Sequence, residues 1–124
     1  LDAPVVRGRG VGRRWGFPTA NLDVSEEKIL PSGVFAVQVV LPTGVDRKGL
    51  LNVGVRPTFR ERFQQRSVEV HLLDFAGDLV GRRLRLGFIK KLRDEKKFPS
   101  VQSLARQIRL DEIAARRVFF SPSH

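Results

Sequence analysis

The chain contains no cysteine and only two histidines, His71 and His124. Without cysteine there can be no disulfide and no thiolate metal centre, and two histidines are too few for a histidine metal cluster. The sequence therefore excludes disulfide-stapled secreted proteins and the metal proteins that depend on thiolate or clustered imidazole ligands.

Long apolar stretches are also missing. No run approaches the roughly 20 residues needed to cross a bilayer, and the opening "LDAPVVRGRG" lacks the basic-then-apolar pattern of a signal peptide. The 124 residues are enough for one independent core, and no repeat or linker divides them. We expect a single cytoplasmic domain over residues 1–124.

Acidic residues are scarce: 13 Asp and Glu stand against 23 Lys and Arg, for a net charge of +10. This excess indicates either an anionic partner or a solvated basic surface. Arginine binds phosphate through planar, bidentate contacts, so polyphosphates and nucleic acids are both suitable partners. A non-catalytic basic β-barrel that binds nucleic acid is one alternative. The sequence has no aromatic-rich strand on which bases could stack, which counts against this alternative.

Apolar runs of strand length dominate the middle of the chain. They predict strands at 33–41, 47–55, 67–75 and 82–92, joined by short turns. In the third of these, Glu69 and His71 alternate with apolar residues and fall on the opposite face. Short strands with hairpin-length turns are typical of an antiparallel barrel or sandwich.

Helical spacing replaces the strand pattern near the C-terminus. Ser100 is suited to cap a helix. The apolar residues that recur at helical spacing after it are Val101, Leu104, Ala105, Ile108 and Ala115. We therefore expect one amphipathic helix packed on the strands.

A cluster of glycines precedes the strands, in "RGRGVGRRWGF". Its spacing matches neither the Rossmann nor the Walker A pattern. Such a segment can still offer backbone N–H groups to a polyphosphate, with arginine charge beside them. An ordinary surface loop accounts for the same residues equally well.

The next stretch, "GFPTAN", carries two short oxygen-bearing side chains, Thr19 and Asn21. Hydroxyl and amide oxygens are suitable ligands for Mg²⁺, which usually completes its shell with water and substrate phosphate. Pro18 restricts the backbone beside them. The alternative is that both side chains only bond the local backbone of a turn.

Glu69 is a candidate base because a carboxylate in the middle of an apolar strand is ionised at neutral pH and can accept a proton. The alternative is an ordinary surface position. After the last strand, Arg93, Glu95 and Phe98 occur where they can form a pocket wall, although Phe98 alone fits a core position.

Taken in order, several segments resemble the riboflavin kinase domain of bacterial bifunctional FAD synthetases (riboflavin kinase/FMN adenylyltransferase). They are "GRGVGRRWGFPTANL", "PSGVFAV", "LLNVGVRPTF", "VEVHLLDFAGDLVG" and "KKLRDEKKFPSVQSLARQIRLD". The resemblance implies a six-stranded antiparallel Greek-key barrel with one C-terminal α-helix. It also implies an enzyme that transfers the γ-phosphate of ATP to the terminal ribityl hydroxyl of riboflavin, giving FMN and ADP.

The resemblance assigns roles to the candidate residues. Thr19 and Asn21 would coordinate Mg²⁺, Glu69 would act as the base, and Arg93, Glu95 and Phe98 would lie by the flavin ring. The nucleotide-binding residues would be Gly10, Gly12, Arg13, Gly16, Pro18, Thr19 and Asn21.

Three residues depart from the family's usual pattern, namely Arg7, Phe35 and Val80, where His, Tyr and Tyr are common. The histidine signature of the adenylyltransferase module cannot occur in this chain, because its two histidines are too far apart. If the parent protein is bifunctional, this chain is its kinase half, and the adenylyltransferase module would lie N-terminal to it. The remaining alternative is a barrel that binds a flavin nucleotide without catalysis.

Overall fold

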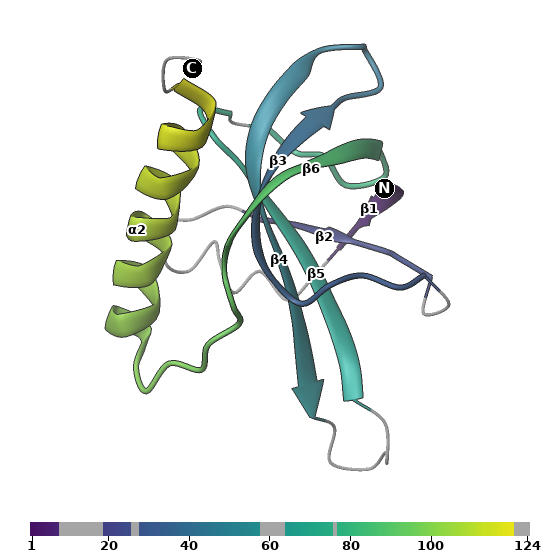
Figure 1. The fold of residues 1–124 in the computed structure, drawn as a ribbon. Coiled ribbons are helices and arrows are strands. Elements are labelled where there is room, and N and C mark those ends of the chain that lie inside the picture. The colour runs from purple at the N-terminus through teal and green to yellow at the C-terminus, as the bar shows by residue number, and fades with distance from the viewer. Residues whose placement is uncertain (8–18, 26–27, 58–63, 76, 121–124) are drawn as a thin grey trace.

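The computed structural model describes residues 1–7, 19–25, 28–57, 64–75 and 77–120 (Figure 1). The strands are β1 (Asp2–Val6), β2 (Ala20–Leu22), β3 (Gly33–Val40), β4 (Asp46–Pro57), β5 (Gln64–Leu72) and β6 (Arg83–Arg93), and the helix is α2 (Val101–Phe120). Among these residues, no helix is long and apolar enough to cross a membrane.

The strands close into an antiparallel barrel in the order β1-β2-β5-β4-β3-β6. Strands β3, β4 and β5 pair consecutively, and β6 returns to pair with β3. Three hairpin-connected strands with a fourth beside the first make a Greek key. The six-stranded Greek-key barrel and its C-terminal helix are therefore confirmed.

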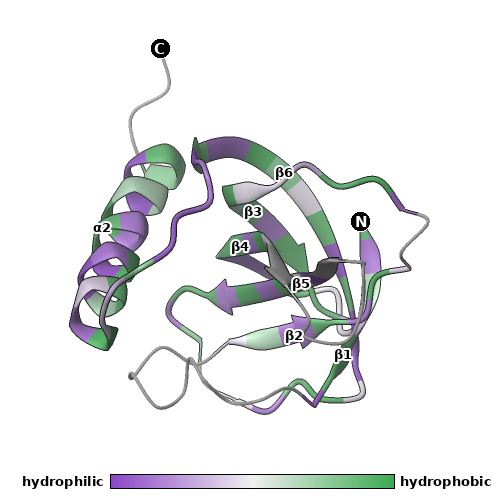
Figure 2. Cartoon of the chain, turned by 90° about the horizontal axis from the view of Figure 1, so that it is seen from below, coloured by the Kyte–Doolittle hydropathy of each residue, from purple (hydrophilic) through white to green (hydrophobic). Residues whose placement is uncertain are grey.

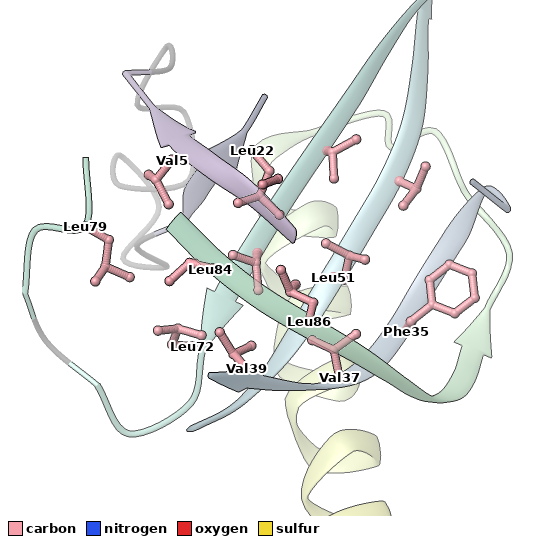
Figure 3. Packing of buried hydrophobic residues seen from close by; sticks show 14 of the residues in the cluster. Val5, Leu22, Phe35, Val37, Val39, Leu51, Leu72, Leu79, Leu84 and Leu86 are labelled. Atoms are coloured by element: carbon pink, nitrogen blue, oxygen red, sulfur yellow. The ribbon is translucent and has the colours of Figure 1, made fainter. Parts of the chain in front are cut away.

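Alternate side chains of every strand fill the barrel, because successive residues of a strand point to opposite faces. The interior is almost entirely aliphatic (Figure 3). The largest fully buried side chains are Leu51, Leu84, Val37, Val39, Val53 and Val70.

A second apolar cluster lies outside the barrel, where α2 covers it. It consists of Val34, Ala36, Leu50, Leu73 and Ala115. We call this cluster the helix-covered patch. Strand β3 contributes to both clusters, which explains why its residues from Gly33 to Val37 are all buried. Figure 2 shows α2 lying beside the barrel wall, with apolar and polar residues interleaved along it.

The predicted helix begins where expected. The Ser100 hydroxyl accepts a hydrogen bond from the backbone N–H of Ser103 at 3.1 Å, as an N-cap does. One of the predicted apolar positions of the helix, Val101, is exposed, because it lies in the first turn of α2. Phe88 is also exposed, and it lies on β6 beyond the residues that β1 pairs with, Arg83–Arg85. The edge of the Phe88 ring still contacts Phe35, with centroids 5.1 Å apart.

Candidate functional site

Three polar residues on neighbouring strands lie directly opposite one another. Asn21 of β2 and Asn52 of β4 are both in register with Glu69 of β5. Opposite residues in antiparallel strands have Cβ atoms about 4.5 to 5.5 Å apart and share a face. The neighbours Val68 and Val70 are buried in the barrel, so this polar row (Asn21, Glu69, Asn52) lies on its outer wall.

The sequence predicted two members of the polar row and missed the third. The predicted face of Glu69 is confirmed, and Asn21 proves to lie in a strand, so the interpretation of Asn21 as a turn residue is wrong. Asn52 was overlooked, although a lone amide inside the apolar run "GLLNVGV" is the same kind of signal that drew attention to Glu69.

Thr19 lies beside the polar row, directly before β2. It lines a cavity of about 80 Å³ formed with β1, β5 and residues 75 and 77–80. Most of the other lining residues are apolar, among them Val6, Leu79 and Val80. The hydroxyl-bearing Thr19 therefore lies at the edge of a mostly apolar cavity. The predicted nucleotide-binding residues Gly10, Gly12, Arg13, Gly16 and Pro18 lie outside the described residues.

The segment after β6 reaches back toward the polar row. Glu95 is an exposed residue whose carboxylate lies against Gly54 of β4: a methyl group built on Gly54 would stand 2.7 Å from the Glu95 Oε1 atom. Gly54 is two residues beyond Asn52 and faces the same side of β4. Glu95 therefore lies next to the polar row, and its role at the flavin stays a prediction.

Arg93, at the end of β6, is held by other protein groups. Its guanidinium donates to both carboxylate oxygens of Asp111 on α2, each at 2.8 Å, and to the backbone oxygen of Asp94 at 3.0 Å. The guanidinium carbon also lies 5.8 Å from the ring centroid of Phe98. Arg93 and Phe98 therefore form a contact with each other, and Asp111 is a residue that the sequence did not bring to attention.

His71 lies two residues after Glu69 on the same face of β5, where it contacts α2. Its Nε2 atom is 2.9 Å from the Glu112 Oε1 atom, and both side chains are largely covered. A lone histidine bonded to a helix in this way fits a structural role better than a catalytic one.

Two surface carboxyl groups near the site have shifted acidities. A hydrogen bond from Arg116 lowers the pKa of Asp74, and one from Lys91 lowers the pKa of Asp94. Both carboxylates therefore stay ionised to lower pH than an unpaired aspartate would. Asp94 carries this charge within the segment that follows β6.

The donors around the polar row suit a hard cation. Within the described ranges, no three His, Cys, Asp or Glu side chains group together as a metal site. A hydroxyl, two amides and a carboxylate are nevertheless oxygen donors, and Mg²⁺ normally takes only one or two protein ligands beside phosphate and water. The residues present thus fit Mg²⁺ that arrives with a phosphorylated ligand.

Comparison with known proteins places these residues in a family. The family model described as riboflavin kinase matches residues 1–119. A bifunctional riboflavin kinase/FMN adenylyltransferase of Escherichia coli strain K12 is 43% identical over 96% of this chain, and one of Bacillus subtilis is 38% identical over 93%. The chain spans 37% of the length of both relatives.

Two solved structures share the fold. One is described as a macrolide-efflux protein from Streptococcus pneumoniae, with a TM-score of 0.83 and 32% identity over 93% of this chain and 37% of that one. The other is a riboflavin kinase from Trypanosoma brucei, with a TM-score of 0.66 and 23% identity over 98% of this chain and 80% of that one. The second supports the barrel architecture alone.

Proposed function

The chain belongs to the riboflavin kinase family, and we propose that it transfers the γ-phosphate of ATP to the terminal ribityl hydroxyl of riboflavin, giving FMN and ADP. The observation that best supports this proposal is the register of Asn21 with Glu69, which puts an amide of the kind that suits Mg²⁺ beside a carboxylate. In phosphoryl transfer, the hydroxyl that accepts the phosphate needs a carboxylate beside it, and the cation bound to the phosphates needs an oxygen ligand close by.

Glu69 serves as the base in this proposal. Its carboxylate accepts a hydrogen bond from the ribityl hydroxyl and takes its proton as the oxygen attacks the γ-phosphorus. The bond from that phosphorus to the β,γ-bridging oxygen breaks, and ADP leaves. Because phosphoryl transfer passes through a loose transition state, the proton leaves late, and Glu69 orients the hydroxyl as much as it deprotonates it.

Thr19 and Asn21 are the residues that would hold Mg²⁺. When bound with ATP, the ion neutralises charge on the phosphate oxygens.

The flavin end of the site would be the segment from Arg93 to Phe98. Glu95 lies against Gly54, within reach of a ligand on the polar row, and Phe98 offers an apolar ring. Arg93 contributes by holding Phe98 and Asp94, since its guanidinium already contacts both residues.

A second proposal concerns the domain composition of the parent protein. Its relatives are named for two activities, and this chain matches 37% of their length. We propose that an adenylyltransferase module lies N-terminal to this domain in the parent. Adenylyl transfer is not assigned to this chain.

The test is an assay of the purified chain with riboflavin, ATP and Mg²⁺, following FMN and ADP by chromatography. Equal amounts of FMN and ADP are expected, with neither formed when EDTA is added or riboflavin is omitted. Titration calorimetry with ADP–Mg²⁺ and with FMN measures binding separately. Absence of FMN, together with salt-sensitive oligonucleotide binding and no heat from either ligand, would favour the basic nucleic-acid-binding barrel.

A further inference from the structure

Asp111 of α2 is the one charged residue that is buried among the residues described by the structure. Burying a carboxylate is costly unless hydrogen bonds and an opposite charge compensate for lost water. A well-packed apolar side chain would often stabilise such a position as well or better. Stability alone therefore does not explain why α2 carries an aspartate on its covered side at position 111.

The partners of Asp111 come from two elements, Arg93 from the end of β6 and Gln107 from α2 itself. Arg93 donates to both carboxylate oxygens in the planar fork that guanidinium forms with carboxylate. Gln107, one helical turn earlier, donates to Oδ1 at 3.0 Å. These donors leave the carboxylate little freedom to turn, so the direction of the Arg93 side chain is fixed by the helix.

The backbone at Arg93 is also closely fitted. Val34 lies opposite Arg93 across the β3–β6 pair. The preceding residue, Gly33, has a φ of +130°, and a Cβ on it would lie 2.8 Å from the Arg93 carbonyl oxygen. A residue with a side chain is strained at that φ and would collide there. Arg93 is thus fixed at its backbone by β3 and at its guanidinium by α2.

The segment that follows depends on this fixed point. The remaining contacts of the Arg93 guanidinium are with the Asp94 carbonyl and the Phe98 ring, and Glu95 reaches Gly54 from the same segment. We propose that Asp111 is a positioning residue for the flavin end of the site, because it holds Arg93, and Arg93 sets the course of residues 94–98. This inference rests on the proposed function.

The test compares Asp111→Asn with the unmodified chain, measuring kcat and the KM values for riboflavin and for ATP. Asparagine presents an amide to a guanidinium donor, so the fork is lost. The KM for riboflavin should rise about tenfold, as small displacements of positioning groups cost that much or more, while the KM for ATP changes less than twofold. Equal changes in both KM values, or no change in either, would overturn the proposal.

Glu112→Gln is the matched control, because Glu112 is the next residue of α2 but contacts His71 rather than Arg93. It should leave the KM for riboflavin within about twofold of the unmodified value, as changes outside an interaction usually do. A rise equal to that in Asp111→Asn would mean that any weakening of α2 has the same effect. That result would also overturn the positioning role.

Arg93→Lys covers the case in which Asp111→Asn fails to fold. Lysine keeps a positive charge for Asp111 but cannot form the fork or hold Asp94 and Phe98 together. The same selective rise in the KM for riboflavin is expected, and the double variant should show no further rise. If the unmodified chain makes no FMN, the proposed function itself is wrong. If it makes FMN and all variants match it, only the role of Asp111 is wrong.

Discussion

The outer wall of the barrel has two regions that share strand β4 but differ in what covers them. Under α2, β3 and β4 present the helix-covered patch, where Val34, Ala36 and Leu50 are buried. Next to it, β2, β5 and β4 present the polar row. Val34 and Asn52 are even direct cross-strand neighbours, so the border between the two regions runs through a single register position. The helix-covered patch packs against α2, and the polar row is where the proposed function requires ligands to bind.

The same contrast appears in two ion pairs made by α2. The Arg93 and Asp111 side chains are 15% and 6% exposed, whereas Arg116 and Asp74, which form an equally well-aligned fork, are 40% and 66% exposed. Exposed pairs are screened by water and contribute little to stability. Two ion pairs with similar geometry can therefore contribute differently to stability. Substitutions can likewise distinguish the two regions by their effects on activity and on stability.

The largest effect is expected from Glu69→Gln in the polar row. Loss of the base should lower kcat by roughly 10² to 10⁴, since general-base catalysis contributes about that factor. The melting temperature should barely change, because the amide keeps the shape of the side chain. Asp23→Asn, an exposed carboxylate just beyond β2, is the control and should keep full activity. If Glu69→Gln kept normal turnover, Glu69 would not be the base, and the polar row would have no chemical role.

The next effect is expected from Leu50→Ala in the helix-covered patch. Removing this buried side chain should lower the free energy of unfolding by about 2 to 5 kcal/mol, from lost burial and the cavity left behind. Urea unfolding measures it, with kcat expected to remain within about twofold at a temperature where the variant is folded. Leu110→Ala, on the exposed side of α2, is the control and should change stability by about 0.5 kcal/mol or less. If Leu50→Ala lowered kcat without lowering stability, the helix-covered patch would not differ from the polar row in the way described.

A smaller and more selective effect is expected from Gly54→Ala at the edge of the polar row. The added methyl group would displace the flexible end of Glu95, which costs little stability but moves a predicted flavin contact. The KM for riboflavin should rise by about fivefold to tenfold. Gly87→Ala is a close control because a methyl group there meets nothing within 4 Å. Identical kinetics for the two alanine variants would mean that Glu95 does not contact the flavin.

The smallest effect is expected from Asp74→Asn, which breaks the exposed ion pair. The hydrogen bond from Arg116 lowers the pKa of Asp74 in the folded chain. Its contribution to stability is therefore present above the ordinary aspartate pKa of about 3.9 and disappears as the pH falls through the lower folded value. The melting temperatures of the two proteins should differ slightly above pH 5 and converge in stronger acid. A difference that grows on acidification would contradict the assignment.

The local pattern of the sequence predicted much of the fold. Alternation placed Glu69 and His71 on the face opposite Val68 and Val70, and helical spacing after Ser100 predicted α2. These features depend on neighbouring residues only. The closed barrel itself followed from the family resemblance, because alternation does not say which strands pair.

The features that were not predicted become evident through contacts between distant segments. Strand β2 is three residues long and has a turn-like composition, so only its pairing with β1 and β5 makes it a strand. Asn52 belongs to the polar row because β4 pairs with β5 in one particular register. Asp111 is unremarkable in an arginine-rich helix until Arg93 is seen beside it.

The short strand β2 makes the candidate site dependent on the completion of folding. Asn21 and Glu69 come together only across the β2–β5 pair, which joins segments far apart in the sequence and has just two register positions. Such non-local pairing forms slowly, because the chain must close a long loop before any contact rewards it. A chain with β3 to β6 assembled but β2 still unpaired would have a core and the Asn52–Glu69 pair, but Asn21 would be missing from the polar row. Activity should therefore appear only after β2 has paired with β5, so enzyme turnover would report that this part of the barrel has folded correctly.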